Sequence, residues 1–432
     1  MTAVDTHRAI EAVWRIESAK LIAGLTRIVR DVGLAEELAQ DALVAALEQW
    51  PEAGVPRNPG AWLMTIAKRR GVDQLRRKTT LERKHEEIGH LEHELERATT
   101  DFDVDPDDDI GDDLLRLMFI ACHPVLSTEA RVALTLRLLG GLTTDEIARA
   151  FLVPEATVAQ RIVRAKRTLS DARIPFEVPP ASERAERLAS VLEVIYLVFN
   201  EGYAATAGDD WLRPHLCEEA TRLGRVLAGL TPQEPEVHGL VALMEIQASR
   251  SRARVGPTGE PVLLLEQDRA RWDQLLIRRG LAALARAEQL GGALGPYALQ
   301  AAIAACHARA RTPDETDWRR IAALYEALAQ TTPSPVVELN RSVALSMAYG
   351  PAAGLELVDQ LTSEPSLKAY HLLPAVRGDL LEKLGRFEEA RAEFARAADL
   401  TRNARERQVL LGRAEASSRA ASDRAATAAD TA

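Results

Sequence analysis

Apolar and polar positions recur at helical spacing along residues 142–169. The second half of this stretch places apolar residues every three or four positions, at Val158, Ile162, Ala165 and Leu169. The first half opens with residue types that cap helices and closes its apolar stripe at Phe151; the candidate caps are Thr143, Thr144, Asp145 and Glu146. Pro154 can stand in the first turn of the following helix. The pattern predicts a helix-turn-helix.

Polar and basic side chains occupy the side of the second helix that faces away from this stripe. They are Thr157, Gln160, Arg161, Arg164, Lys166 and Arg167. In a helix-turn-helix the N-terminal members of such a set can reach base edges in the major groove, and the others can reach phosphates. The alternative is an amphipathic surface helix with a solvated charged face. We expect DNA binding.

The remaining pattern is helical almost throughout, and we predict an all-α protein. Aromatic residues make up 4% of the 432 residues, while strong helix formers such as Ala, Leu, Arg and Glu dominate. The length suggests roughly two to four domains. We expect a helical block at 1–78, an acidic linker at 79–113, the helix-turn-helix domain at 114–173, a helical domain at 181–416 and a flexible tail at 417–432.

Charge is unevenly distributed. The net charge is −10, from 54 basic and 64 acidic residues, but residues 79–113 alone hold fourteen acidic residues against three basic ones. The rest of the chain is close to neutral, so local basic faces can still meet phosphate.

Two helices of the first block have different surfaces. The helix predicted at 34–50 carries acidic and polar residues away from its apolar side, including Glu37, Gln40 and Asp41, which suits a protein partner. After a break at 51–60, the helix at 61–78 combines an apolar face with cations that suit a nucleic-acid backbone; these include Lys68, Arg69, Arg76 and Arg77. The alternative is a bundle whose last helix ends in cations because they favour its C-terminal dipole.

Signals for catalysis, metal binding and membrane insertion are weak. Cys122, Cys217 and Cys306 lie too far apart for a zinc or disulfide framework, so we expect buried thiols. The histidines of residues 85–93 do not follow the H-E-x-x-H pattern, and no phosphate-binding loop or nucleophile elbow occurs. We expect a cytoplasmic protein that is not an enzyme and needs no cofactor or metal, with no contact to a membrane.

Two motifs resemble the extracytoplasmic-function (ECF) sigma factors of bacterial RNA polymerase. TVAQRIVRAKRTL at 157–169 resembles the region 4 pattern TVxSRxxRARxxL, and WLMTIAKRRGVDQLRR at 62–77 resembles the region 2 pattern WLxxIAxNxxxDxxRR. Ala159, Gln160 and Arg70 depart from the residues common in the family. These departures affect which promoter bases the protein would read. They do not alter the resemblance to the class of ECF sigma factors.

The resemblance implies a region 2 helical bundle, a region 4 helix-turn-helix and two partners, core RNA polymerase and promoter DNA. Glu37, Gln40 and Asp41 would lie on the helix that grips the β′ clamp helices, and region 4 would meet the β flap. Region 4 would read the −35 element as duplex. The melted −10 element would be held by Arg57, Asn58, Trp62, Lys68, Arg69, Arg76 and Arg77, with Trp62 either a core residue or a wedge.

The C-terminal half resembles the ECF subgroup with a long tetratricopeptide (TPR)-like extension. Residues 384–400 resemble the second helix of a TPR, with Gly378 before it and Ala390, Phe394 and Ala397 at its packing positions. A weaker copy starts at Tyr349, where the family commonly has Asp. The resemblance implies regulation in cis and a small DGPF/YCII-type protein as a possible partner. The alternative for this half is a plain stabilising bundle.

Two other functions remain open at the level of sequence. One is a TPR-bearing helix-turn-helix regulator that acts without a sigma role, and the other is a helical scaffold whose helix-turn-helix contacts protein.

Overall fold

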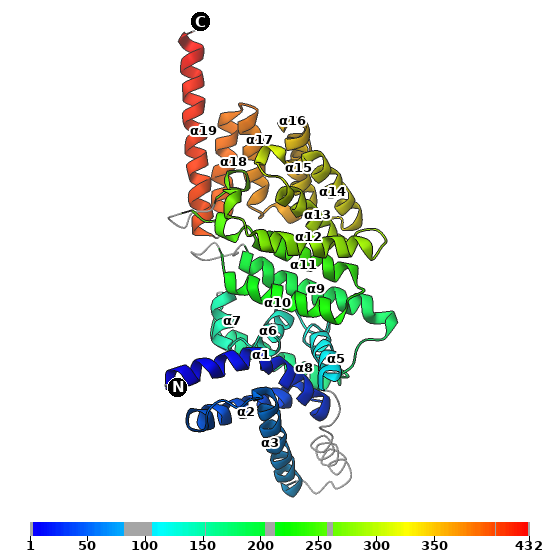
Figure 1. The fold of residues 1–432 in the computed structure, drawn as a ribbon. Helices are drawn as coiled ribbons and strands as arrows, with labels where there is room; N and C mark the ends of the chain where they lie inside the picture. The colour runs from blue at the N-terminus through cyan, green and yellow to red at the C-terminus, as the bar shows by residue number, and fades with distance from the viewer. Residues whose placement is uncertain are drawn as a thin grey trace. The chain divides into compact units, whose positions relative to one another are not determined.

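A computed structural model describes residues 3–81, 106–151, 153–203, 212–256, 262–401 and 403–430, with backbone alone at 3–5, 72–81, 106–111 and 423–430. Helices form the regular structure of these residues, and no β-strand occurs among them. The all-α prediction is confirmed. The chain divides into two compact units, Met1–Leu197 and Val198–Ala432 (Figure 1).

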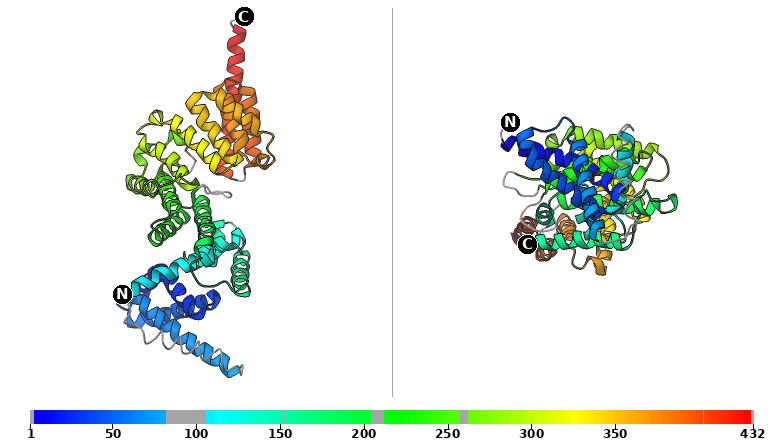
Figure 2. Two further views of the ribbon diagram at one scale, coloured as in Figure 1. Left: turned by 90° about the vertical axis from the view of Figure 1, so that its right-hand side faces the viewer. Right: turned by 90° about the horizontal axis from the view of Figure 1, so that it is seen from below.

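The first unit begins with three helices that pack on one another. They are α1 (Ala3–Val29), α2 (Val32–Ala53) and α3 (Pro59–Leu81), drawn in blue in Figures 1 and 2. Asp31 caps α2 by accepting a hydrogen bond from the backbone N–H of Leu34 at 2.8 Å. The inner face of α2 is rich in alanine, with Ala35, Ala39 and Ala42 fully buried. These small side chains let α1 and α2 approach closely.

The rest of the first unit holds α5 (Pro106–Ala121), α6 (Thr128–Leu138), α7 (Thr144–Phe151), α8 (Glu155–Asp171) and most of α9 (Ala181–Tyr203). The helix α5 packs on α1, and α6, α7 and α8 pack on one another. The first part of α9 is tied to this group by hydrogen bonds from Ser190 Oγ to the carbonyl of Cys122 (2.6 Å) and from Arg187 to the carbonyl of Phe119 (3.0 Å).

The linker between the helical block and the helix-turn-helix domain is shorter than the sequence suggests. Residues 106–113 already form the first turns of α5, and α3 continues to Leu81. Proline and acidic residues both favour a helix N-terminus, which explains why this charged stretch is helical. Asp113 is buried and forms ion pairs with Arg27 of α1 (3.1 Å) and Arg116 (2.7 Å). The remaining linker residues, 82–105, lie outside the described part.

The second unit is a succession of helices, most of which pack on their neighbours in the sequence. They are α10 (Pro214–Leu230), α11 (Pro235–Ala248), α12 (Gln274–Gln289), α13 (Pro296–Arg309), α14 (Trp318–Thr331), α15 (Pro335–Tyr349), α16 (Pro351–Leu361), α17 (Leu372–Lys383), α18 (Phe387–Leu400) and α19 (Ala404–Asp430), coloured green to red in Figure 1. The helix α13 is an exception, because it packs more on α11 than on α12.

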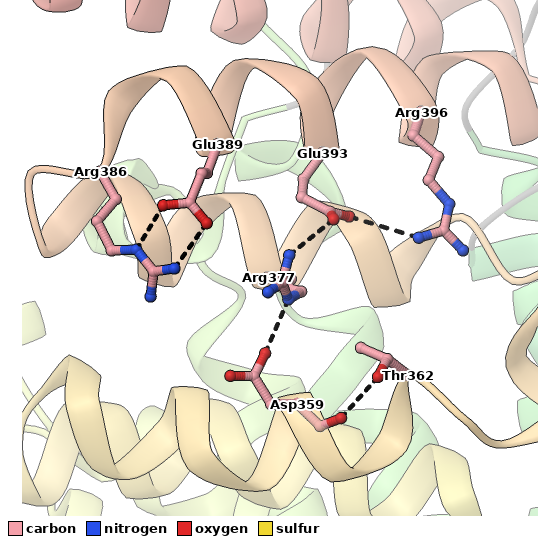
Figure 3. A network of polar contacts seen from close by, with 7 residues as sticks. All are labelled: Asp359, Thr362, Arg377, Arg386, Glu389, Glu393 and Arg396. Atoms are coloured by element: carbon pink, nitrogen blue, oxygen red, sulfur yellow. Dashed lines mark hydrogen bonds and ion pairs between the residues drawn. The ribbon is translucent and has the colours of Figure 1, made fainter.

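The helices α17 and α18 meet at a close contact that the sequence indicates. Phe394 is fully buried, and a Cβ at Gly378 would lie 2.9 Å from its ring. Ala390 and Ala397 are buried beside it, as their spacing predicts. Beside this core, Arg377 joins three helices by ion pairs with Asp359 of α16 and Glu393 of α18, both at 2.8 Å (Figure 3). Apolar and ionic contacts therefore hold the same helices together.

The C-terminal helix does not end where the sequence suggests. We expect a flexible tail from residue 417, but α19 continues to Asp430. Ser417 is fully buried and donates a hydrogen bond to Glu382 of α17 at 2.8 Å. This segment is rich in alanine, a composition that the sequence pattern alone assigns to a flexible tail. Alanine is also a strong helix former, so the same composition favours a helix.

Candidate nucleic-acid interface

The helix-turn-helix of the first unit is formed by α7 and α8. Thr143 and Glu146 make a capping box: the Glu146 N–H donates to Thr143 Oγ1 (3.1 Å), and the Thr143 N–H donates to Glu146 Oε2 (2.8 Å). The helix α8 begins at Glu155, directly after Pro154, one residue later than the sequence suggests. The predicted capped start of α7 is confirmed, and Phe151 belongs to this helix.

The two sides of α8 differ as the pattern predicts. Its buried residues are Val158, Ile162, Ala165 and Leu169. Gln160, Arg164 and Arg167 are exposed, while Thr157, Arg161 and Lys166 are partly buried. Arg167 makes a 3.4 Å contact with the exposed carboxylate of Asp171 one turn on, and such a surface pair adds little energy. The outer side of α8 therefore presents two guanidinium groups, Arg164 and Arg167, together with an amide.

Lys166 has a different environment from the other cations of α8. It forms an ion pair with Glu36 of α2, whose side chain is 3% exposed. Glu36 also accepts hydrogen bonds from Arg137 Nε of α6 at 2.7 Å and from Gln40 Nε2 at 2.6 Å. One buried carboxylate thus binds two cations of the helix-turn-helix domain.

Further contacts join the same parts of the first unit. Ser170 Oγ of α8 donates to Asp31 Oδ2 at 3.2 Å, so Asp31 caps α2 and binds α8 with separate oxygens. Arg15 of α1 lies 3.6 Å from the carboxylate of Glu146. Gly141, with φ +67°, turns the chain before α7, and a Cβ there would lie 3.1 Å from Ser18 Oγ of α1.

The outer surface of α2 combines acidic and apolar side chains. Glu37 and Asp41 are exposed, as are Val44 (47%) and Leu47 (38%). Gln40 is partly buried because it contacts Glu36. Asp41 lies 3.4 Å from Arg70 of α3, and both side chains are largely solvated. The surface is suited to a protein partner with both basic and apolar groups.

The turn before α3 presents two of the predicted residues. Asn58 caps α3 by accepting from the Ala61 N–H at 3.1 Å, and Arg57 is exposed. Trp62 is half-buried and packs edge-on against the fully buried Trp50, with ring centroids 5.3 Å apart. That contact ties the start of α3 to the end of α2.

The cations of α3 are not equivalent. Lys68 is 7% exposed, and burial lowers the pKa of its ammonium group, with a smaller contribution from the charge of Arg27. Arg69, its neighbour, is exposed. The backbone of Arg76 and Arg77 belongs to α3, but their side chains lie outside the described part.

Glu36 is the residue that sequence reasoning missed. It lies beside the Ala35 and Leu38 stripe of α2, and this position on the flank of an apolar face is the only signal in the sequence. Its partners Arg137 and Lys166 are more than a hundred residues away along the chain. No local pattern could have paired them.

The three cysteines are buried thiols, as expected. Burial raises the pKa of Cys122 to about 11 and that of Cys217 to about 12. Within the described part, no group of three His, Cys, Asp or Glu side chains could hold a metal ion. The histidines of residues 85–93 lie outside the described residues. Of the helices that the structure describes, none has the length and apolar character needed to cross a membrane.

The helical block and the helix-turn-helix each match a known protein family. Sigma-70 region 2 matches residues 17–80, and sigma-70 region 4 matches residues 116–169. A family of unknown function (DUF6596) matches residues 187–288. The chain therefore carries sigma-70 regions 2 and 4 in the order expected of an ECF-type sigma factor, a class of DNA-binding transcription initiation factors.

Comparison with individual proteins adds a relative that spans both units. An uncharacterized protein of Rhizobium meliloti (strain 1021) is 45% identical over 390 residues, 89% of this chain and 90% of that protein. The chain therefore belongs to the same family as this protein. Its own sigma-70 regions 2 and 4 lie in the first unit.

Relatives named as sigma factors match less than half of the chain. The probable ECF RNA polymerase sigma factor SigI of Mycobacterium tuberculosis (strain ATCC 25618 / H37Rv) is 28% identical over 182 residues, 42% of this chain and 61% of that protein. The ECF RNA polymerase sigma factor SigK of Mycobacterium ulcerans (strain Agy99) is 30% identical over 149 residues, 34% of this chain and 75% of that protein. No solved structure matches the chain. These relatives do not favour a helix-turn-helix regulator without a sigma role.

Proposed function

We propose that the chain brings core RNA polymerase to specific promoters and that α8 reads the −35 element in the major groove. The observation that carries the proposal is the two-sided α8, which follows a capped α7 and exposes Gln160, Arg164 and Arg167. Arginine guanidinium groups bind guanine edges and phosphates by paired hydrogen bonds, and glutamine can bind adenine.

The second part of the proposal concerns the melted −10 element. The turn with Arg57 and Asn58 would hold an unstacked base, and the exposed Arg69 would contact phosphates of the opened strand. Lys68 is too buried for the same role and would position α3 instead. The Trp62–Trp50 contact favours a packing role for Trp62. Arg76 and Arg77 remain candidates from the sequence.

The polymerase would bind the outer surface of α2. Glu37 and Asp41 supply negative charge, and Val44 and Leu47 supply apolar area beside them. Gln40 would contribute less directly, because its amide is engaged with Glu36. The β′ clamp helices are the partner that the family resemblance implies for this surface, and the β flap is the one it implies for region 4.

We further propose that the second unit regulates activity through a protein or peptide partner. Its support is the succession of helix pairs, with the Gly378–Phe394 contact that the TPR pattern predicts. Nothing in the comparisons points to a DGPF/YCII-type partner, which stays a prediction from the resemblance.

Promoter-directed transcription with paired variants tests the role of α8. The Arg161→Ala/Arg164→Ala double variant should lose at least tenfold of run-off transcript from the DNA upstream of the chain's own gene, because each lost base or phosphate contact costs about 1–3 kcal/mol. The control Arg278→Ala/Arg319→Ala removes two exposed guanidinium groups from the second unit and should keep wild-type transcription. Equal transcription by the two double variants would contradict the proposed role.

A further inference from the structure

Five arginines gather on two short segments of the second unit. Arg250, Arg252 and Arg254 lie at and after the end of α11, around the 3₁₀ turn Ser251–Ala253, and Arg269 and Arg271 lie on the 3₁₀ turn Arg269–Arg271. The segments are joined by a hydrogen bond from the Asp273 N–H to the carbonyl of Ser249 at 2.9 Å. The alternating Arg-x-Arg pattern is visible in the sequence of both segments.

Three of these arginines lie against aromatic rings. The Arg254 guanidinium carbon is 3.6 Å from the centre of the Tyr203 ring, and that of Arg269 is 4.8 Å from the Trp272 ring. Arg250 lies between the two rings, 5.9 Å from Tyr203 and 5.7 Å from Trp272. Cation–π contacts of this kind hold the guanidinium groups in place without neutralising them.

Carboxylates balance this charge only in part: the charge of Glu315 acts on Arg269, but no ion pair joins these two described residues. In the described part of the chain, Arg250, Arg252, Arg269 and Arg271 form no ion pair within 4 Å. The positive potential is reflected in His307, whose pKa falls to about 4, first because of burial and then because of Arg250 and Arg269. Burial also lowers the pKa of Arg254 and of Arg269.

Hydrogen-bond donors in the cluster are left unused. Trp272 is 4% exposed, and its Nε1 has no hydrogen-bond partner among the described residues. The same holds for the Nε atoms of Arg250 and Arg269. Buried donors without acceptors are uncommon in folded proteins, since each costs about 1–3 kcal/mol. Of these three side chains, Trp272 lines a cavity in which a ligand can supply an acceptor for its Nε1.

A cavity of about 630 Å³ opens beside the cluster. It is lined by Ser251, Arg252, Val255, Ala270, Arg271, Trp272 and Asp273. Arg252 and Arg271 are exposed. The carboxylate of Asp273 is engaged in capping α12, where it accepts from the N–H groups of Leu275 (2.9 Å) and Leu276 (3.1 Å). The volume lies in the range of small-molecule sites.

We propose that this cavity binds a small organic molecule that carries a phosphate group. Arg252 and Arg271 contact the phosphate, since guanidinium groups match its oxygens by paired, charge-assisted hydrogen bonds. Trp272 and Val255 line the space for the organic part. Arg250, Arg254 and Arg269 raise the positive potential from behind and position Trp272. The site does not depend on the sigma role of the first unit.

Isothermal titration of the full-length chain at low ionic strength tests the proposal, with adenosine monophosphate and inorganic phosphate as probes. We expect saturable binding of at least one probe at one site per chain. Arg252→Ala/Arg271→Ala should weaken this binding at least tenfold, while the matched control Arg278→Ala/Arg319→Ala should leave it unchanged. Circular dichroism checks that both variants are folded.

Three results would overturn the proposal. They are no saturable binding of either probe, equal binding by Arg252→Ala/Arg271→Ala and the wild type, and equal weakening by both double variants, which would indicate a general charge effect. Because polymerase is absent from the titration, these results are independent of promoter-directed transcription.

Discussion

Glu36 and Glu37 are neighbouring residues on α2 with opposite environments. Glu36 is buried against Arg137 and Lys166, and Glu37 faces solvent. Cations enclose the carboxylate of Glu36 but not that of Glu37. The stability of the first unit should therefore depend on Glu36 and not on Glu37. The outward residues of α8 are readable from periodicity, whereas the capture of Lys166 by Glu36 depends on tertiary contacts.

Glu36→Gln should lower the free energy of unfolding of the first unit by about 1–3 kcal/mol. The amide keeps one hydrogen-bond acceptor but leaves two cations without their carboxylate. Glu37→Gln, the matched control, should change stability by less than about 0.5 kcal/mol. Urea unfolding followed by circular dichroism measures both. If the two variants have equal midpoints, Glu36 does not hold α2 to the helix-turn-helix domain.

His307 should make the second unit sensitive to acid. Its pKa is lowered to about 4 from a usual value of 6.5, so between these values the unfolded chain binds more protons than the folded one. Stability therefore falls as the pH drops from 6.5 toward 4 and is unaffected by this group above 6.5. The full loss would be about 3 kcal/mol for a shift of this size.

The variant His307→Phe keeps a ring beside Trp318, which packs edge-on against His307 with centroids 5.1 Å apart. It should lose less stability than the wild type between pH 7 and pH 5, measured as the drop in Tm. A drop equal to that of the wild type would show that the acid sensitivity comes from other groups, such as His123, whose pKa is also lowered to about 4.

At the scale of elements, the pairing of α17 and α18 depends on Gly378. A methyl group there would lie 2.9 Å from the Phe394 ring, which is fully buried. We expect Gly378→Ala to cost about 1–3 kcal/mol through overpacking. At Gly229 of α10 a Cβ meets nothing within 4 Å, so Gly229→Ala should be neutral or stabilising by up to about 1 kcal/mol. Thermal unfolding compares the Gly378→Ala and Gly229→Ala variants. Equal Tm values for the two would refute the close contact between Gly378 and the Phe394 ring.

Local pattern predicts the elements better than their ends. The stripe Val158–Leu169 and the Thr143–Glu146 cap follow from spacing alone and are found as expected. The start of α5 in an acidic stretch and the continuation of α19 past residue 416 are missed, because composition that suits a linker or tail also suits a helix terminus or a surface helix. The burial of Lys68 is missed because it depends on the tertiary packing of α3 against α1 and α2, which a helical pattern does not encode.

At the scale of the molecule, one chain combines a sigma unit with a helical unit of comparable size. The probable sigma factor SigI of Mycobacterium tuberculosis matches 42% of the chain, while the Rhizobium relative matches 89% of it. The two units therefore occur together in at least one further protein. The first unit supplies the candidate promoter and polymerase surfaces, and the second supplies the arginine cavity and the stack of helix pairs.

We infer that the chain initiates transcription only together with core RNA polymerase. The most direct test is run-off transcription from the DNA upstream of its own gene, with core enzyme alone, the chain alone and both combined. We expect a discrete transcript from the combination alone, reduced at least tenfold by Arg161→Ala/Arg164→Ala. A combination that yields no more transcript than core enzyme alone, while the isolated chain binds the same DNA specifically, would contradict this inference.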